Sequence, residues 1–155
     1  MKMAHKPIEA PPNHKRIITI TLMMVDEFLS ECELWARGRE LGSVLYRERN
    51  SLTPEQRERL LQKVESLRVI LTEAQRTLGL ETTVKEPARV IQAACFTLFE
   101  SLIEIQGKYI RGYGEPPAEL VEYLDPMSQD IMAIIQDITK IVSPRVKKPE
   151  DTTRA

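Results

Sequence analysis

Arginine side chains are the most concentrated group in this sequence that could bind a ligand. Seven basic and four acidic residues lie between positions 37 and 63, so this segment carries a net charge of +3. The arginines that we consider as anion-binding candidates are Arg37, Arg39, Arg47, Arg49, Arg57 and Arg59. Guanidinium groups at one end of a helical hairpin would suit a phosphate or a nucleic-acid backbone. The alternatives are a partner protein, or a solvated turn whose arginines pair with acids one helical turn away.

Carboxylates at helical spacing raise the question of a metal centre. Glu27 precedes Glu31 by four residues, and Glu100 precedes Glu104 in the same way. Ferritin-like centres need such carboxylates to face inward and to be joined by Glu-x-x-His pairs. A helical wheel points all four away from the apolar faces, and the two histidines lie within the first fourteen residues. We therefore expect no metal ion and no other cofactor.

Residues for nucleophilic catalysis are also lacking in the sequence pattern. Cys32 and Cys95 lie among apolar residues, where burial disfavours the reactive thiolate, and neither has a histidine nearby. The sequence holds no phosphate-binding GxxxxGK[ST] loop and no CxxC pair. We expect two reduced thiols and no catalytic residue, and we favour a protein that is not an enzyme.

The net charge and the hydropathy of the sequence argue against a strongly basic protein and against a membrane-spanning one. The formal net charge of the 155 residues is -1, so nucleic acid is an unlikely partner on charge grounds. The most apolar run, residues 17–25, is far shorter than the ~20 residues that span a bilayer. Asp26 and Glu27 follow it, where a signal peptide would have its cleavage site. We expect a cytoplasmic protein without a membrane partner.

Apolar residues recur in alternating steps of four and three, which is typical of packed helices. The first of three such rows comprises Leu60, Val64, Leu67, Leu71, Ala74 and Leu78. The second comprises Ile91, Cys95, Leu98, Leu102, Ile105 and Tyr109. The third comprises Leu120, Leu124, Met127, Ile131, Ile134, Ile138 and Ile141. An earlier face contains Ile18, Leu22, Val25, Leu29, Cys32 and Ala36. Four helices follow from these patterns.

The first helix is expected to begin near residue 14, and Gly38 makes its end ambiguous. Either the helix kinks at Gly38 and continues to about residue 50, or it breaks there. We favour continuation, because most residues from 39 to 49 are competent helix formers and none is proline. Gly38 and Gly42 both weaken this prediction.

The remaining helix boundaries have clearer signals. Thr53 to Gln56 form a capping box with proline at the first helical position, and Gly79 ends this second helix. A third helix is expected from the Thr82–Pro87 region to about residue 111. In the fourth, Asp125 before Pro126 predicts a kink or a restart, and the helix ends before residue 144.

These elements predict an all-α, up-and-down four-helix bundle with a long first helix. We expect the bundle domain to span residues 14–142, between flexible tails at residues 1–13 and 143–155. The third helix carries a second apolar row made of Phe96, Phe99, Ile103 and Ile110. Either this helix sits centrally in the bundle, or the row forms the interface of a homo-oligomer or a partner protein.

Three functions remain open on this basis. The leading hypothesis is a non-catalytic helical interaction or structural module that self-associates. The first alternative is an accessory protein that binds an anion or nucleic acid through the arginine-rich end of the first two helices. The second alternative is a bundle that binds a small ligand, or an enzyme whose site is assembled at a dimer interface.

Overall fold

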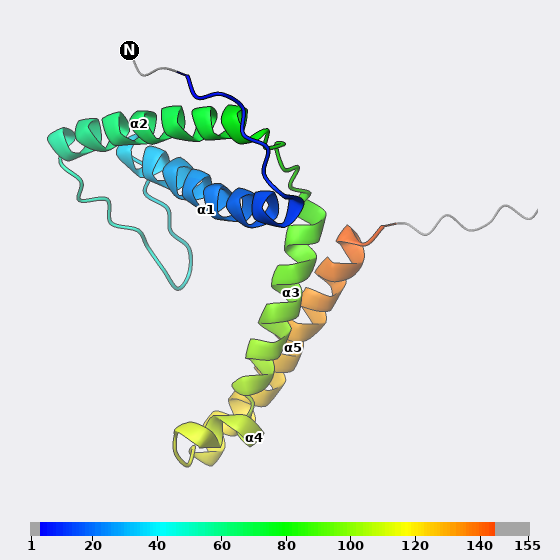
Figure 1. Cartoon of the computed structure of the whole chain (residues 1–155). Coiled ribbons are helices and arrows are strands. Elements are labelled where there is room, and N and C mark those ends of the chain that lie inside the picture. The colour runs from blue at the N-terminus through cyan, green and yellow to red at the C-terminus, as the bar shows by residue number, and fades with distance from the viewer. Residues whose placement is uncertain (1–3, 145–155) are drawn as a thin grey trace, which may run out of the picture. The chain divides into compact units, whose positions relative to one another are not determined.

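The computed structural model describes residues 4–144 and is built from helices (Figure 1). These are α1 (Pro12–Ala36), α2 (Pro54–Leu78), α3 (Pro87–Glu104), α4 (Gly107–Ile110), the 3-10 helix η1 (Arg111–Tyr113) and α5 (Ala118–Val142). Residues 4–144 form no β-strand, and their one isolated bridge joins Gly42 to Arg47. The all-α prediction is confirmed. The chain divides into two compact units, residues 1–82 and 83–155, which we describe one at a time.

The first unit is a hairpin of the antiparallel helices α1 and α2 (Figure 1). Its core is centred on Leu29, Cys32 and Val64. Val25, Leu60 and Leu71 pack around these three side chains and are partly buried. The residues of α1 in this core belong to the apolar face that the sequence predicts, and so do those of α2. Within this unit the sequence pattern therefore identifies the helix contact correctly.

Helix α1 ends at Ala36, so the predicted continuation past Gly38 to about residue 50 is wrong. Gly38 has a φ of 97°, a left-handed conformation that favours glycine. The Arg39 backbone N–H donates to the Leu34 carbonyl at 2.9 Å, and the Gly38 N–H donates to the Trp35 carbonyl at 2.9 Å. This pair of hydrogen bonds is the Schellman motif that closes helix C-termini. Residues 37–53 therefore form a loop.

Helix α2 begins and ends as the sequence predicts. The Thr53 hydroxyl accepts from the Gln56 backbone N–H at 3.2 Å, and the Gln56 side chain accepts from the Thr53 N–H at 2.9 Å. Gly79 has a φ of 61° and ends the helix. Ahead of α1, residues predicted as tail lie against α2. The Ile8 N–H donates to the Thr77 carbonyl at 2.7 Å.

The second unit pairs α3 with α5 in antiparallel fashion (Figure 1). The third helix was predicted to reach about residue 111, but α3 ends at Glu104. Gln106 is extended, with a ψ of 151°, and Gly107 begins the short helix α4. A Cβ atom at Gly107 would lie 2.4 Å from a γ carbon of Val121, so only glycine permits this close approach. A contact across the hairpin therefore accompanies the break in the helix.

Helix α5 runs without interruption through Pro126, so the predicted restart does not occur. Asp125 was expected to cap a new helix, but its carboxylate accepts from the Gly107 N–H at 2.8 Å. One turn further along, Ser128 is fully buried and its hydroxyl donates to the Leu102 carbonyl at 2.9 Å. Both polar side chains of α5 thus satisfy backbone groups near the end of α3.

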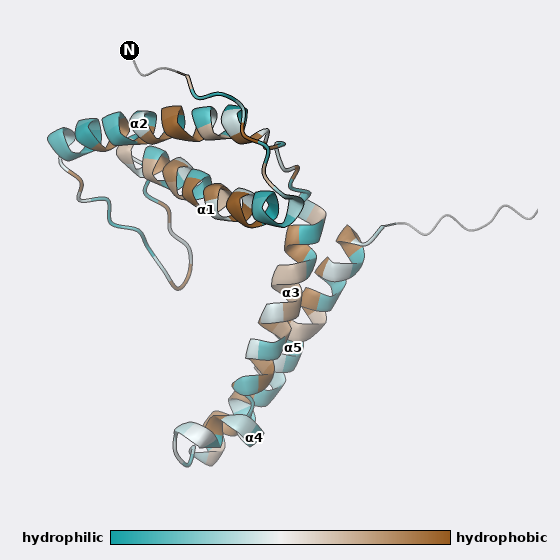
Figure 2. Ribbon diagram, in the orientation of Figure 1, coloured by the Kyte–Doolittle hydropathy of each residue, from teal (hydrophilic) through white to brown (hydrophobic). Residues whose placement is uncertain are grey.

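The structure supports two helical hairpins, and the predicted four-helix bundle is not confirmed. Among the described residues, six apolar side chains are buried and 26 large apolar side chains are exposed. Apolar segments recur along α1, α3 and α5 (Figure 2). A hairpin of two helices can cover only one side of each, so much of the apolar surface faces outward.

Candidate interaction surfaces

One side of the second unit presents a continuous apolar surface, which we call the α3/α5 open face. Its members are large aliphatic residues whose exposed fractions lie between 37% and 79%. They are Ile91, Leu98, Leu120, Ile131, Ile134, Ile138 and Ile141. Exposed apolar residues on the surfaces of monomeric proteins usually occur singly, whereas large contiguous groups are typical of interaction sites.

The two rows of the open face lie on the same side of the hairpin. On α5, the row through Ile134 is rotated by about 100° from the row through Ser128 and Ile135 that is buried against α3. On α3, Ile91 and Leu98 are rotated in the same sense, by about 80°, from the buried contact with α5. Because the helices run antiparallel, equal rotations bring both rows to one side.

The open face itself carries no charge. On α5 the nearest charged residues are Glu119, Asp130 and Asp137, which lie at the edge of the aliphatic row. The Asp137 carboxylate lies 4.0 Å from the Lys140 ammonium. An uncharged aliphatic surface cannot bind an anion or a metal ion, but it suits another aliphatic surface.

The residues that the sequence suggested as an interface, Phe96, Phe99, Ile103 and Ile110, do not belong to the α3/α5 open face. Phe99, Ile103 and Ile110 are half-buried. Phe96 is 68% exposed, and the helical wheel places it on the opposite side of α3 from Leu98. The roles that the sequence suggested for the two apolar rows of this helix are therefore only partly reversed. In the row predicted as the bundle seam, Cys95 is buried while Ile91 and Leu98 are exposed, and three of the four residues predicted as an interface are half-buried.

A comparable row is exposed in the first unit. It comprises Ile17, Ile20, Met24 and Phe28 of α1 with Leu67 and Ile70 of α2, whose exposed fractions lie between 37% and 66%. The helical wheel again places both sets on one side of their hairpin. Lys63 lies in the same row of α2, so this surface is more polar than the α3/α5 open face.

The loop between α1 and α2 is the other surface that the helical patterns did not predict. Its residues 41–48 fold back in a tight hairpin, since the Glu48 N–H donates to the Leu41 carbonyl at 2.7 Å. The Ser43 N–H donates to the Tyr46 carbonyl at 2.9 Å. Val44 and Leu45, at the tip, are 93% and 95% exposed. We refer to Val44, Leu45 and Tyr46 as the loop tip.

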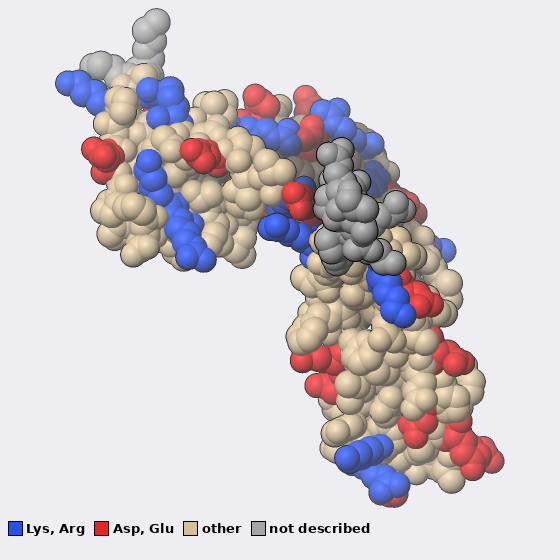
Figure 3. All heavy atoms as spheres, turned by 90° about the vertical axis from the view of Figure 1, so that its right-hand side faces the viewer, with Lys and Arg blue, Asp and Glu red and all other residues tan. Residues whose placement is uncertain are grey.

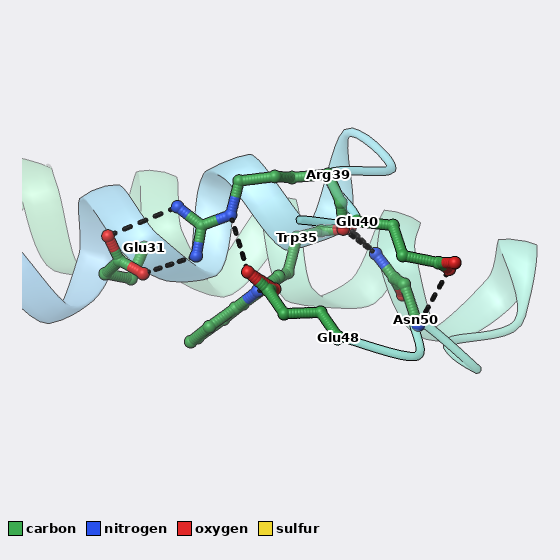
Figure 4. Close-up of polar contacts among 6 residues, drawn as sticks. All are labelled: Glu31, Trp35, Arg39, Glu40, Glu48 and Asn50. Carbon is green, nitrogen blue, oxygen red and sulfur yellow. Dashed lines mark hydrogen bonds and ion pairs between the residues drawn. The ribbon is translucent and has the colours of Figure 1, made fainter. Parts of the chain in front are cut away.

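A polar network fixes the base of this loop to the end of α1 (Figure 4). The Arg39 guanidinium donates to both carboxylate oxygens of Glu31, at 2.6 and 3.3 Å, and lies 3.6 Å from the Glu48 carboxylate. The Trp35 indole N–H donates to Glu48, and the guanidinium lies 4.9 Å from the indole ring centre. The hydrogen bond from Arg39 lowers the pKa of Glu31 and raises that of Arg39.

Asn50 completes the network from the other end of the loop (Figure 4). Its side-chain amide donates to the carbonyls of Trp35 and Arg39, at 2.8 and 2.9 Å. Its backbone N–H donates to the Glu40 carboxylate at 3.0 Å. The two ends of the loop are therefore tied together, which sets the position of the residues between them.

The six candidate anion-binding arginines do not form one site. Arg37 pairs with Glu33 at 3.0 Å, and the Arg57 side chain donates to the Leu52 carbonyl at 3.1 Å. Arg39 is held in the network above. Within residues 4–144, the side chains of Arg47, Arg49 and Arg59 form neither an ion pair nor a hydrogen bond. On the face shown in Figure 3, basic and acidic side chains are interspersed.

Other chemistry finds little support in the part of the chain that the structure describes. A cavity of about 470 Å³ opens beside the loop and is lined mainly by apolar atoms. Its lining residues are Trp35, Glu48, Arg49, Asn50, Ser51, Leu52 and Leu60. No group of three His, Cys, Asp or Glu side chains within residues 4–144 could hold a metal ion. None of the described helices is long and apolar enough to span a bilayer.

Comparison with known proteins adds no functional information. No protein-family description, curated protein or solved structure matches this chain. Functional inference therefore depends on the chain's own surfaces. Of these, the sequence pattern contained the residues of the α3/α5 open face but assigned them to the interior. The loop tip was missed, although Gly38 and Gly42 were signals that the helix stops before it.

Proposed function

We propose that this protein is a non-catalytic helical interaction module of the cytoplasm that self-associates through the α3/α5 open face. One observation carries the proposal, namely that seven large aliphatic side chains are exposed together on one side of a two-helix unit. A surface of this composition offers no group for acid–base, nucleophilic or metal chemistry. The only large favourable free-energy change available to this surface is its removal from water.

A second copy of the same face is the partner that fits best. A two-fold axis places the same patch of two subunits against each other, and an uncharged aliphatic patch brings no like charges together. Two α3–α5 hairpins joined in this way would form a four-helix bundle between subunits. The spacing of Ile131, Ile134, Ile138 and Ile141 in steps of three and four suits such a contact.

The free energy available to this contact is large enough for association. Full burial of a Leu or Ile side chain stabilises by ~1.5–3 kcal/mol, and each copy offers seven such residues that are partly exposed. If association buries the exposed half of these fourteen side chains, the two copies together are stabilised by roughly 10–20 kcal/mol. Association costs ~4–15 kcal/mol in lost freedom of motion.

The decisive experiment compares aspartate substitutions on opposite sides of α3 and α5. Light scattering should give the mass of a dimer for the wild type and of a monomer for Ile134→Asp. Circular dichroism should show that this variant keeps its helices, because Ile134 is not buried within the hairpin. Phe96→Asp is the matched control, and it should remain dimeric because Phe96 lies outside the open face.

Three results would contradict the proposal. A wild type that stays monomeric at high concentration would mean that another part of the same chain, or a foreign partner, covers the open face. An Ile134→Asp variant that unfolds would place this residue in a core. If Phe96→Asp becomes monomeric while Ile134→Asp stays dimeric, the interface is the row that the sequence suggested, which comprises Phe96, Phe99, Ile103 and Ile110.

The alternative of binding an anion or nucleic acid has less support. The 37–63 segment is basic, but half of its six candidate arginines are held by Glu31, Glu33, Glu48 or a backbone carbonyl. A salt-sensitive shift on heparin would favour this alternative, because phosphate contacts weaken steeply with salt. A rise in melting temperature with a small ligand would favour a ligand-binding bundle.

A further inference from the structure

The loop tip is an apolar surface that the proposed self-association does not use. Val44 and Leu45 expose nearly all of their side chains, and Tyr46 is also largely exposed. All three lie in the tight turn closed by the hydrogen bonds of Ser43 and Glu48. The Val44 and Leu45 side chains take no part in the network at the base of the loop, so the fold gives no internal reason for aliphatic residues here.

The loop is held so that its tip stays in solvent. Arg39 and Asn50 fix its two ends to the last turn of α1, and the turn itself is closed by backbone hydrogen bonds (Figure 4). The loop also projects away from the two helices of its unit (Figure 1). A loop that is ordered and yet exposes its aliphatic residues costs less entropy on binding than one that must first be ordered.

The unpaired charge beside the loop tip is positive. Arg47 follows Tyr46 directly, and neither Arg47 nor Arg49 forms an ion pair within the described part of the chain. The two neighbouring acids are engaged, because Glu48 accepts from Trp35 and pairs with Arg39, and Glu40 accepts from the Asn50 N–H. The tip therefore combines aliphatic side chains, one tyrosine and two free guanidinium groups.

We propose that the loop tip inserts into the interface of an anionic lipid membrane, with Val44 and Leu45 in the acyl region and Arg47 and Arg49 against the headgroups. Interfacial anchors of this composition bind by apolar burial together with attraction between basic residues and anionic lipids. Tyrosine is enriched at the headgroup level, where Tyr46 would lie. The contact is peripheral and needs no spanning helix.

The convex shape of the tip favours a membrane over an acidic protein. A stable protein interface buries ~800 Å² on each partner and involves 20–30 residues. Three residues at the end of a turn provide much less than this against a rigid surface. A bilayer deforms around a projecting group and thus buries it completely. The sequence predicts no membrane partner because it lacks a run of apolar residues long enough to span a bilayer, and a peripheral contact is compatible with that absence.

Sedimentation with vesicles tests this proposal on the full chain. The wild type should sediment with vesicles of phosphatidylcholine that contain phosphatidylglycerol, and at least tenfold less with phosphatidylcholine alone. Leu45→Asp should lower binding to the anionic vesicles at least tenfold. Val84→Asp is the matched control, because Val84 is an aliphatic residue of the second unit that is 82% exposed, and the binding of this variant should equal that of the wild type.

The arginine contribution is tested by the double variant Arg47→Gln and Arg49→Gln. Its binding should be weaker and should depend less on salt than that of the wild type, because fewer cations meet the anionic surface. Arg16→Gln, at an exposed arginine of α1, should leave binding unchanged. Circular dichroism and light scattering on each variant establish that the fold and the oligomeric state are retained.

The outcomes separate a membrane from a protein partner. A wild type that stays in solution with anionic vesicles overturns the proposal, and so does a Leu45→Asp variant that binds them as well as the wild type. If Leu45→Asp changes the oligomeric mass while no variant binds vesicles, the tip contacts a second copy instead. None of these results depends on the α3/α5 open face, which Ile134→Asp tests separately.

Discussion

Gly107 lies close to Val121 of α5 at the start of α4, with no room for a side chain between them. A methyl group there would lie 2.4 Å from one valine γ carbon. We expect Gly107→Ala to push α4 away from α5 and to lower the free energy of unfolding by ~1–3 kcal/mol, a usual cost of overpacking. Thermal unfolding followed by circular dichroism measures the change. Gly112→Ala is the control, because its Cβ atom would meet nothing within 4 Å, and equal losses would refute the argument.

Glu73 holds the N-terminal segment against α2. Hydrogen bonds from Arg76 and from the His5 backbone N–H hold the pKa of the Glu73 carboxyl at about 2, below its usual 4.5. The carboxylate contact therefore stabilises the segment above pH 4.5 and is lost as the pH falls toward 2. We expect the Ile8 backbone N–H, which donates to Thr77, to exchange faster across that range. Hydrogen exchange followed by NMR spectroscopy measures this effect.

A substitution separates this contact from general acid unfolding. Glu73→Gln should speed exchange of the Ile8 N–H at neutral pH, because an amide cannot replace the ion pair with Arg76. Glu58→Gln, on an exposed part of α2 and without an ion pair in the described structure, should leave it unchanged. A Glu73 carboxyl that titrates near 4.5 in the folded protein would show that the contact does not form in solution.

At the scale of elements, Arg39 is the side chain that links the 37–53 loop to Glu31 of α1. Arg39 joins Glu31 of α1 to Glu48 of the loop and covers the Trp35 ring. We expect Arg39→Ala to loosen the loop while α1 and α2 stay helical, so trypsin should cleave faster after Arg47 and Arg49. Arg39→Lys should behave similarly, because an ammonium cannot make the two-point contact with Glu31.

A neighbouring arginine provides the comparison for this experiment. The Arg37 side chain pairs only with Glu33 in the last turn of α1, and it forms no hydrogen bond or ion pair with residues 38–53. Arg37→Ala should leave the rate of cleavage within the loop unchanged. If both variants are cleaved at the wild-type rate, the backbone turn alone orders the loop. The loss of helical signal in Arg39→Ala would mean that the network supports the whole hairpin.

Local signals predicted some helix ends and not others, for physical reasons. Thr53 with Gln56, and Gly79, act through hydrogen bonds to residues only a few positions away, so the sequence alone reveals them. Gly38 also acts through such local hydrogen bonds. Residues with good helix propensity follow it, however, so the sequence favoured a helix that continues past Gly38. The end of α3 differs, because Gly107 meets Val121 from another helix. No pattern within α3 contains that information.

At the scale of the whole molecule, periodicity finds an apolar face but not the neighbour that covers it. The hairpin contact of α5 includes the hydroxyl of Ser128 beside Ile135, and Gly107 allows a close approach. The aliphatic residues of the predicted seam, such as Ile134 and Ile141, remain exposed. Hydrophobicity ranks the aliphatic row first, whereas hydrogen bonding and close packing favour the row with Ser128 for the hairpin.

The presence of two apolar rows on α5 explains why the sequence has the apolar spacing of a helical bundle although each unit is only a hairpin. Alternating steps of three and four residues are needed wherever helices interdigitate over several turns, whether in one chain or between chains. In α5 both rows have this spacing, but only the open row is aliphatic throughout, because the row against α3 includes Ser128 and Thr139. The hairpin therefore leaves the more apolar row of α5 uncovered. A second copy that offers the identical row would cover it, and Ile134→Asp addresses that contact alone.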